Sequence, residues 1–182
     1  MLILLAPSQT YHQVDEIWTG NTDTNLSPDG IRDASTLQWY DAVHAERAFV
    51  APATHMQEFA KIVLVTGEYE VLPELTDRSM GTLTGRGYRE TMLEFPRRNW
   101  LAWQRSYWIA PPEGESFFDI NDRVLTAFRT KILPITAIEH VCIIAAPDVL
   151  RILIGHLTKL EETEIPKIRI ESCVPHTITG DL

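Results

Sequence analysis

Cysteine is scarce in this chain of 182 residues, which contains only Cys142 and Cys173. Cys142 lies in an apolar run typical of a strand, where a reduced, buried thiol is more common than a disulfide or a metal ligand. The six histidines and two cysteines show no spacing typical of a metal site. The cysteine content therefore favours reduced thiols over a disulfide framework and predicts a reducing compartment. We expect no metal and no other cofactor.

The sequence also lacks a long hydrophobic run. Its apolar N-terminus extends over only about six residues, which is too short for the hydrophobic region of a signal peptide and far too short to span a membrane. We therefore expect a cytoplasmic protein that does not enter a membrane.

Positive charge is in the minority, because 25 Asp and Glu residues outnumber 16 Lys and Arg residues and give a formal net charge of -9. Phosphate backbones are held mainly by clustered Lys and Arg. The acidic balance therefore argues against nucleic acid or an anionic membrane as a partner. It also argues mildly against anionic substrates.

What the sequence does contain is an alternation of strand-like and helix-like segments. Such alternation is typical of a mainly parallel sheet with helices on both faces, so we predict an α/β fold, a three-layer α/β/α sandwich. The length suits one domain, 1–182, and no repeat or linker divides it. We expect strands at 2–5, 48–51, 70–75, 141–145, 167–170 and 176–179, helices at 28–44, 52–65, 91–107, 116–131 and 148–160, and loops at 8–26 and 76–87.

Two of the expected strands, 2–5 and 141–145, consist entirely of apolar residues, which suits strands covered on both faces. In α/β proteins ligands bind at the carboxyl ends of such strands. Here those ends read Ala6-Pro7-Ser8 and Ala146-Pro147. The places where the fold predicts an active site therefore carry no obvious catalytic side chain.

Five segments, 18–30, 77–85, 103–112, 112–116 and 143–157, match one family in order. Leu26-Ser27-Pro28-Asp29-Gly30 is similar to its Leu-Ser-x-x-Gly, Asp77-Arg78-Ser79-Met80-Gly81 to its Glu-Arg-His-Tyr-Gly, and Pro112-Glu113-Gly114-Glu115-Ser116 to its Pro-x-Gly-Glu-Ser. The chain resembles the cofactor-dependent phosphoglycerate mutases of the histidine phosphatase superfamily over nearly its whole length. The resemblance implies their fold and, in that family, phosphoryl transfer through a histidine.

The same resemblance shows where the chain departs from the family. Ala6-Pro7-Ser8 stands where the family has Arg-His-Gly, whose histidine accepts the phosphoryl group, and Ala146-Pro147 stands where it has a second histidine and a glycine. A family arginine falls on Met56. We interpret the chain as a degenerate member that lacks both active-site histidines. Further departures are Ser79, Met80, Tyr88 in place of a lysine, and Gln104 in place of the first of two arginines.

These departures bear directly on phosphoryl chemistry, which needs an imidazole nitrogen aimed at phosphorus and cations around the equatorial oxygens. Neither alanine nor proline supplies a lone pair, so a phosphohistidine at Pro7 is excluded by atom type. Four lost charge-assisted hydrogen bonds, at about 1.5–3 kcal/mol each, remove on the order of 6–10 kcal/mol of phosphate binding. We therefore expect no useful phosphate affinity at the strand ends.

Part of the family's pocket remains in the sequence. The resemblance implies a residual acid at Asp77, where the family has its acid/base glutamate. It also implies residual substrate-binding positions at Gln13, Thr19, Gly20, Arg78 and Arg105. An alternative is that Asp77 and Arg78 form an ordinary structural ion pair, because such pairs also resemble sites.

A replacement nucleophile is a further alternative. Ser8 and Thr10 follow the first strand, and His12 and His55 lie close in sequence to the lost positions. No set of nucleophile, base and orienting group is visible among them. The simpler interpretation is that the hydroxyls make turn hydrogen bonds, that His12 lies in a loop and that His55 lies on a helix face.

The residues support three hypotheses for function. The first is a catalytically inactive pseudoenzyme that keeps the family's fold and binds a protein partner or a non-phosphate ligand. The second is an enzyme of the superfamily with a relocated or altered active site. The third is a structural homo-oligomer, such as a dimer, which the resemblance implies because the family commonly forms dimers or tetramers.

Overall fold

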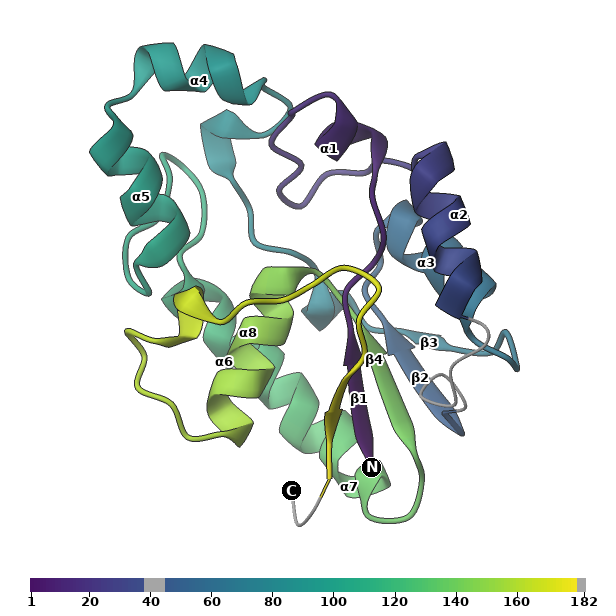
Figure 1. Ribbon diagram of the computed structural model, residues 1–182. Coiled ribbons are helices and arrows are strands. Elements are labelled where there is room, and N and C mark those ends of the chain that lie inside the picture. Colours follow the sequence, from purple (N-terminus) through teal and green to yellow (C-terminus); the bar gives the residue numbers. More distant parts are fainter. Residues whose placement is uncertain (38–44, 180–182) are drawn as a thin grey trace.

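The computed structural model describes residues 1–37 and 45–179, and its centre is a five-stranded sheet in the order β3-β2-β4-β1-β5 (Figure 1). β1 to β4 pair in parallel, and β5 pairs antiparallel with β1. Parallel pairing places the carboxyl ends of the central strands β1 and β4 side by side. The strands are β1 (Leu2–Leu5), β2 (Arg47–Val50), β3 (Glu70–Val71), β4 (Val141–Ile144) and β5 (His176–Ile178).

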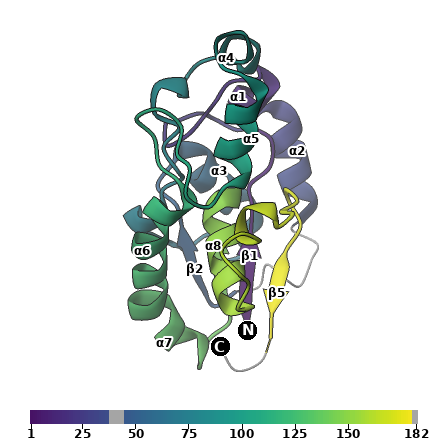
Figure 2. The same ribbon diagram turned by 90° about the vertical axis from the view of Figure 1, so that its left-hand side faces the viewer.

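Helices cover both faces of the sheet. Helices α6 and α8 pack against each other, as do α2 and α3, and the two views show these pairs on opposite sides of the strands (Figures 1 and 2). The predicted three-layer α/β/α sandwich is therefore confirmed. The helices are α1 (Tyr11–Val14), α2 (Pro28–Thr36), α3 (Thr54–Val63), α4 (Tyr88–Glu94), α5 (Arg97–Arg105), α6 (Phe117–Ala127), α7 (Leu133–Thr136) and α8 (Pro147–Leu157).

The two apolar strands form the middle of the core. Every residue of β1 and β4 is 0% exposed, which agrees with their unbroken apolar sequence. The helices after them start at local signals. The Ser27 hydroxyl accepts the backbone N–H of Gly30 at 3.0 Å and caps α2, and Pro147 occupies the first turn of α8, where its missing N–H costs nothing.

A second, smaller core lies beyond the carboxyl ends of the strands. The segments that carry α1, α4 and α5 gather there, at the top of Figure 1. The rings of Trp18 and Trp100 pack at a tilt of 57° with their centroids 4.9 Å apart, and the Trp18 indole N–H donates to the Thr91 hydroxyl at 3.0 Å. This cluster supports the walls of the region above the sheet. Its buried members are Trp18, Met80, Leu83, Trp100 and Trp103.

Three predicted elements are corrected by the structure. The helix expected over 91–107 is split into α4 and α5 at Phe95-Pro96, because proline excludes helical geometry in the residue before it and lacks the N–H for an internal helix bond. The strand expected over 70–75 ends at Val71, since Pro73 opens a 3-10 helix. The strand expected over 167–170 is absent, and a 3-10 helix (Ile165–Lys167) lies there instead.

Other expectations have mixed outcomes. The loop expected over 8–26 contains α1, which begins at a Thr10 capping box. The expected end of the helix from 28 to 44 lies outside the described residues. The helix expected over 116–131 continues through a π-helical turn (Phe128–Ile132) into α7. Within 1–37 and 45–179 no helix combines the length and the apolar character needed to cross a membrane.

Candidate ligand-binding cleft at the strand ends

The ends of β1 and β4 are closed off inside the protein. Ala6 is 1% exposed and Ala146 is 2% exposed, and Pro7 is buried as well. A later segment crosses the end of β1, because Ala6 forms an isolated bridge with Ser172 and its carbonyl accepts the N–H of Cys173 at 3.2 Å. Within the described part of the chain, the residues that follow β1 and β4 are Ala6-Pro7 and Ala146-Pro147, and none of them carries an imidazole.

A cleft of about 770 Å³ lies next to these closed ends. Pro147 and Asp148, at the start of α8, form part of its wall. All six residues of the predicted residual pocket line it: Gln13, Thr19, Gly20, Asp77, Arg78 and Arg105. The fold therefore brings these residues together, and their binding of a ligand stays a prediction. Gln13 is partly committed, since its side-chain oxygen accepts the N–H of Thr10 at 2.9 Å.

Arg78 is the most buried charge of the cleft, at 4% exposure. Its Nε donates to Asp148 Oδ2 at 2.8 Å, and its Nη1 donates to the carbonyl oxygens of Trp103 and Glu115 at 3.0 and 3.1 Å. The guanidinium also lies 4.7 Å from the ring centroid of Phe117. The suggested ion pair between Asp77 and Arg78 is therefore wrong in its partner, because Asp148 pairs with Arg78.

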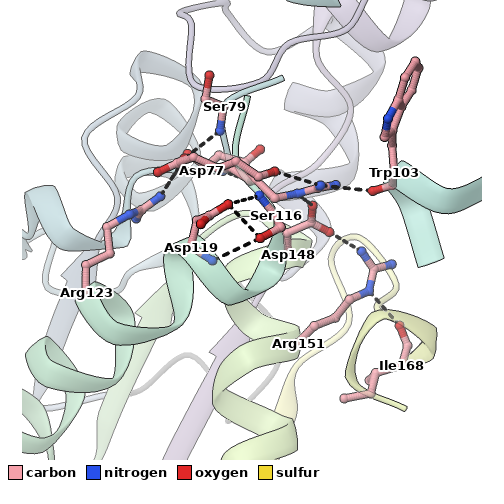
Figure 3. A network of polar contacts seen from close by, with 11 residues as sticks. Asp77, Ser79, Trp103, Ser116, Asp119, Arg123, Asp148, Arg151 and Ile168 are labelled. Carbon is pink, nitrogen blue, oxygen red and sulfur yellow. Dashed lines mark hydrogen bonds and ion pairs between the residues drawn. The ribbon is translucent and has the colours of Figure 1, made fainter. Parts of the chain in front are cut away.

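A second arginine holds the loop that carries Asp77. Arg123 Nη1 donates to the carbonyl oxygens of Glu74 and Thr76 at 2.8 and 2.6 Å, and Glu115 Oε2 accepts the backbone N–H of Ser79 at 2.8 Å. Figure 3 shows Arg123 and Ser79 within a wider set of polar contacts that also includes Asp148 and Arg151. The network therefore holds the loop over 74–79 through contacts to its backbone as well as through the Arg78 side chain.

Comparison with known proteins assigns the chain to a family over nearly its whole length. A family model for the histidine phosphatase superfamily (branch 1) matches residues 2–180. The chain belongs to this superfamily. The family resemblance read from the sequence is therefore confirmed.

Individual relatives of the superfamily agree with this assignment. The chain is 27% identical to the 2,3-bisphosphoglycerate-dependent phosphoglycerate mutase 2 of Gloeobacter violaceus, over 96% of this chain and 83% of that protein. The alpha-ribazole phosphatase from Shigella flexneri has a TM-score of 0.81 at 25% identity, covering 96% of this chain and 87% of that one. Bacillus stearothermophilus YhfR has a TM-score of 0.85 at 22% identity, covering 99% and 92%.

In this histidine phosphatase superfamily chain, Asp77 is the titratable acid of the cleft. Burial raises the pKa of Asp77 to about 7, and the negative charge of Asp148 adds to the rise. The backbone N–H of Arg78, which donates to Asp77 Oδ1 at 2.7 Å, and the charges of Arg78 and Arg123 oppose it. Asp77 therefore exchanges a proton near neutral pH, which suits a general acid or base.

The raised pKa of Asp77 gives a pH-dependent stability. The folded state holds this proton up to about pH 7 while the unfolded chain loses it near pH 3.8, so Asp77 lowers stability as pH rises through that window. We expect Asp77→Asn to gain about 1–3 kcal/mol relative to the parent between pH 5 and pH 8. Urea unfolding at both pH values measures the change.

Asp119→Asn is the matched control for Asp77→Asn. Hydrogen bonds from the Ser116 backbone N–H and hydroxyl lower the pKa of Asp119, so both states are ionised above pH 5 and the effect of the control substitution stays constant between pH 5 and pH 8. Equal pH trends in the two variants would contradict a raised pKa at Asp77.

The cleft also gathers positive charge that the sequence did not point to. Arg151 donates from Nη1 to Asp148 Oδ1 at 2.5 Å and from Nε to the carbonyl of Ile168 at 2.9 Å. Lys167 and Arg169 line the same cleft from the segment that follows. None of these three cations was predicted as a site residue: the strand expected over 167–170 assigned Lys167 and Arg169 to the sheet, and Arg151 was expected only as part of a helix. The acid Asp148 was also missed, although it directly follows the second strand end.

The replacement nucleophiles do not assemble into a catalytic set. The Thr10 hydroxyl accepts the Gln13 N–H at 3.3 Å, as the simpler interpretation predicted. Ser8 is 1% exposed, and among the described residues its hydroxyl makes no turn hydrogen bond, which differs from the simpler interpretation; its neighbour is the Cys173 thiol. Within those residues, no serine or threonine hydroxyl is hydrogen-bonded to a histidine, and no group of three His, Cys, Asp or Glu side chains is arranged to hold a metal.

His55 is buried on α3, at 7% exposure. It borders a smaller hollow of about 280 Å³ together with Met56 and Asp77. Burial lowers the pKa of His55, although the charge of Asp23 opposes the change. His55 is therefore a neutral imidazole at pH 7, close to the main cleft but on the side of Met56 and Asp23.

Proposed function

We propose that this member of the histidine phosphatase superfamily does not form a phosphohistidine and acts by binding a ligand in the cleft above its strand ends. One observation carries the proposal: the central strands end in the buried residues Ala6, Pro7 and Ala146, none of which can act as a nucleophile, while the cleft beside them stays open and is lined with polar side chains.

The chemistry of the strand ends supports the part of the proposal that concerns the absence of phosphohistidine catalysis. In-line attack on phosphorus needs a lone pair at the end of β1, and proline has none there. The arginine that the family resemblance places at Met56 is also missing, and Met56 is 2% exposed. The phosphoryl group of a substrate would thus meet neither a nucleophile nor a cation at the strand ends. The relatives are named as mutases and phosphatases, and those names describe the activities of those proteins, not the activity of this chain.

A phosphatase assay tests this function. We expect purified protein to release phosphate from p-nitrophenyl phosphate and 3-phosphoglycerate no faster than a heat-treated sample, because the nucleophile is absent. Intact-mass spectrometry after incubation with a phosphate donor should show no added phosphoryl group. The control is any active relative prepared in the same way. Turnover that elutes with the protein and is lost in Asp77→Asn or His55→Gln would contradict the proposal.

A relocated active site is the second candidate, and the titration of Asp77 favours it. A carboxyl group with a pKa of about 7 in an open cleft can take or give a proton at neutral pH. Such an enzyme would act without a covalent phosphoryl intermediate. The phosphatase assay on Asp77→Asn separates this enzyme from the binding role. If Asp77 is the acid or base of a relocated site, the parent protein shows turnover and the substitution abolishes it. If Asp77 is only structural, the substitution changes stability and leaves turnover unaffected.

A further inference from the structure

The α4–α5 segment, residues 86–105, has a charge balance opposite to that of the whole chain. It contains five arginines and only two glutamates, whereas the full chain has 16 Lys and Arg residues against 25 Asp and Glu residues. Both glutamates are already engaged, because Glu90 and Glu94 form ion pairs with Arg86. The remaining arginines therefore give this part of the surface an excess of positive charge.

Three of these arginines are exposed and lie outside the lining of the cleft: Arg89, Arg97 and Arg98. The side chains of Arg97 and Arg98 make no ion pair or hydrogen bond with any residue that the structure describes. Arg89 lies 3.3 Å from Glu16, in a pair whose side chains are 88% and 54% exposed. Exposed pairs of this kind contribute little to stability. All three guanidinium groups can therefore meet an anionic surface without breaking a strong contact.

Exposed apolar side chains accompany these arginines. Leu93 is 91% exposed, Met92 57% and Leu101 39%. Helical spacing places Leu93 on the same face of α4 as Arg89, four residues earlier, and Leu101 on the same face of α5 as Arg98, three residues earlier. Single exposed apolar residues need no explanation, but apolar side chains gathered on a surface indicate an interaction site.

The opposite faces of α4 and α5 anchor the segment. Thr91 is 0% exposed and accepts the Trp18 indole N–H at 3.0 Å, and Trp100 and Trp103 belong to the second core. Both views place α4 at one end of the molecule and α7 at the other (Figures 1 and 2). The exposed arginines and apolar residues therefore form a projecting tip on a fixed base, which suits a flat partner surface.

We propose that this tip binds peripherally to the surface of an anionic lipid membrane. The arginines meet the lipid headgroups, and Met92 and Leu93 enter the boundary between headgroups and acyl chains. Arginine suits this place, because its aliphatic stem lies along apolar surface while its charge stays in water. The net charge of the whole chain argues against such a partner, but attraction to a membrane surface falls off within a Debye length, so the local charge decides it. The inference is independent of the binding function proposed for the cleft.

Co-sedimentation with lipid vesicles tests the partner. We expect the protein to pellet with vesicles of phosphatidylcholine and phosphatidylserine in equal parts, and to bind phosphatidylcholine alone at least about tenfold more weakly. Added salt should release the protein from the mixed vesicles, because the interacting charges are exposed. Absence of binding to the mixed vesicles, or equal binding to both kinds, overturns the inference. Retention on immobilised polyglutamate without vesicle binding would also overturn it and assign the tip to an acidic protein segment.

The double variant Arg97→Gln/Arg98→Gln locates the charged part of the tip. We expect it to weaken binding to the mixed vesicles about tenfold or more, because each arginine near an anionic surface contributes about fivefold. The control Arg32→Gln/Lys61→Gln removes the same charge from α2 and α3 and should change binding less than about twofold. Both pairs replace exposed side chains, and circular dichroism confirms folding. Equal weakening by the two double variants overturns the inference.

The variant Leu93→Gln locates the apolar part. We expect it to weaken binding to the mixed vesicles about tenfold, because a leucine at the headgroup boundary contributes through apolar burial. Ile138→Gln is the matched control, since Ile138 is 80% exposed and follows α7, at the other end of the molecule. Unchanged binding of Leu93→Gln, or the same loss in Ile138→Gln, contradicts insertion of the tip.

Discussion

Replacing Asp148 with alanine is expected to lower the free energy of unfolding by about 3–5 kcal/mol, the largest loss we predict for one cleft side chain. The substitution leaves Arg78, which is 4% exposed, without the carboxylate that accepts its Nε at 2.8 Å. It also frees Arg151 from its contact with the same carboxylate. Removing one partner of a buried ion pair leaves the charge of the other partner poorly solvated and without compensation. Urea denaturation at pH 7 measures the loss.

The control for Asp148→Ala is Asp122→Ala, which removes an exposed carboxylate from α6 and should change stability by less than about 0.5 kcal/mol. A double-mutant cycle with Arg78→Met sharpens the test. The double variant should lose clearly less than the sum of the single losses, because the stranded charge is gone. Additive losses would show that the two residues do not depend on each other.

Gly81→Ala is expected to destabilise the protein by more than about 3 kcal/mol, or to prevent folding. Gly81 has a φ of +55, and a Cβ at this position would overlap backbone atoms of Pro112, Glu113 and Gly114. Those atoms belong to a backbone contact in which Thr82 N–H donates to the Pro112 carbonyl at 3.0 Å. Backbone atoms cannot rotate away as a flexible side chain would. Thermal unfolding by circular dichroism measures the effect.

Gly85→Ala is the matched control for Gly81→Ala. Gly85 also has a positive φ, of +78, but nothing lies within 4 Å of its added Cβ. Only the backbone cost remains, so we expect a loss of about 1–2 kcal/mol. If the two variants lost the same stability, the close approach of the loops over 79–82 and 112–115 would not be a determinant of the fold.

Much of the scaffold could be predicted because its signals are local. The apolar runs of β1 and β4 and the Ser27 cap of α2 lie within a few residues of the elements they specify. Pro96 is an equally local signal. Because proline ends or kinks a helix, it predicts a break in the helix expected over 91–107. The apolar Ile168 and Ile170 resembled a strand, but no neighbouring strand pairs with them in the described part of the chain.

The cleft could be predicted only in outline. Family resemblance brought Asp77, Arg78 and Arg105 together, but Arg78 pairs with Asp148, 70 residues later in the chain. Net charge averages over the whole surface and says nothing of how charges are distributed. The cationic side chains that line the cleft come from α5, α8 and residues 167–169, which only the fold places side by side.

The sequence by itself determined the strands of the core, the superfamily and the absence of an imidazole directly after β1 and β4, since an absent atom is absent in any conformation. Tertiary structure decided that those strand ends are closed, that a charged cleft stays open beside them, and that the pKa of Asp77 rises. Burial, ion pairing and charge clustering depend on distances between residues far apart in the chain, and those distances exist only once the chain has folded.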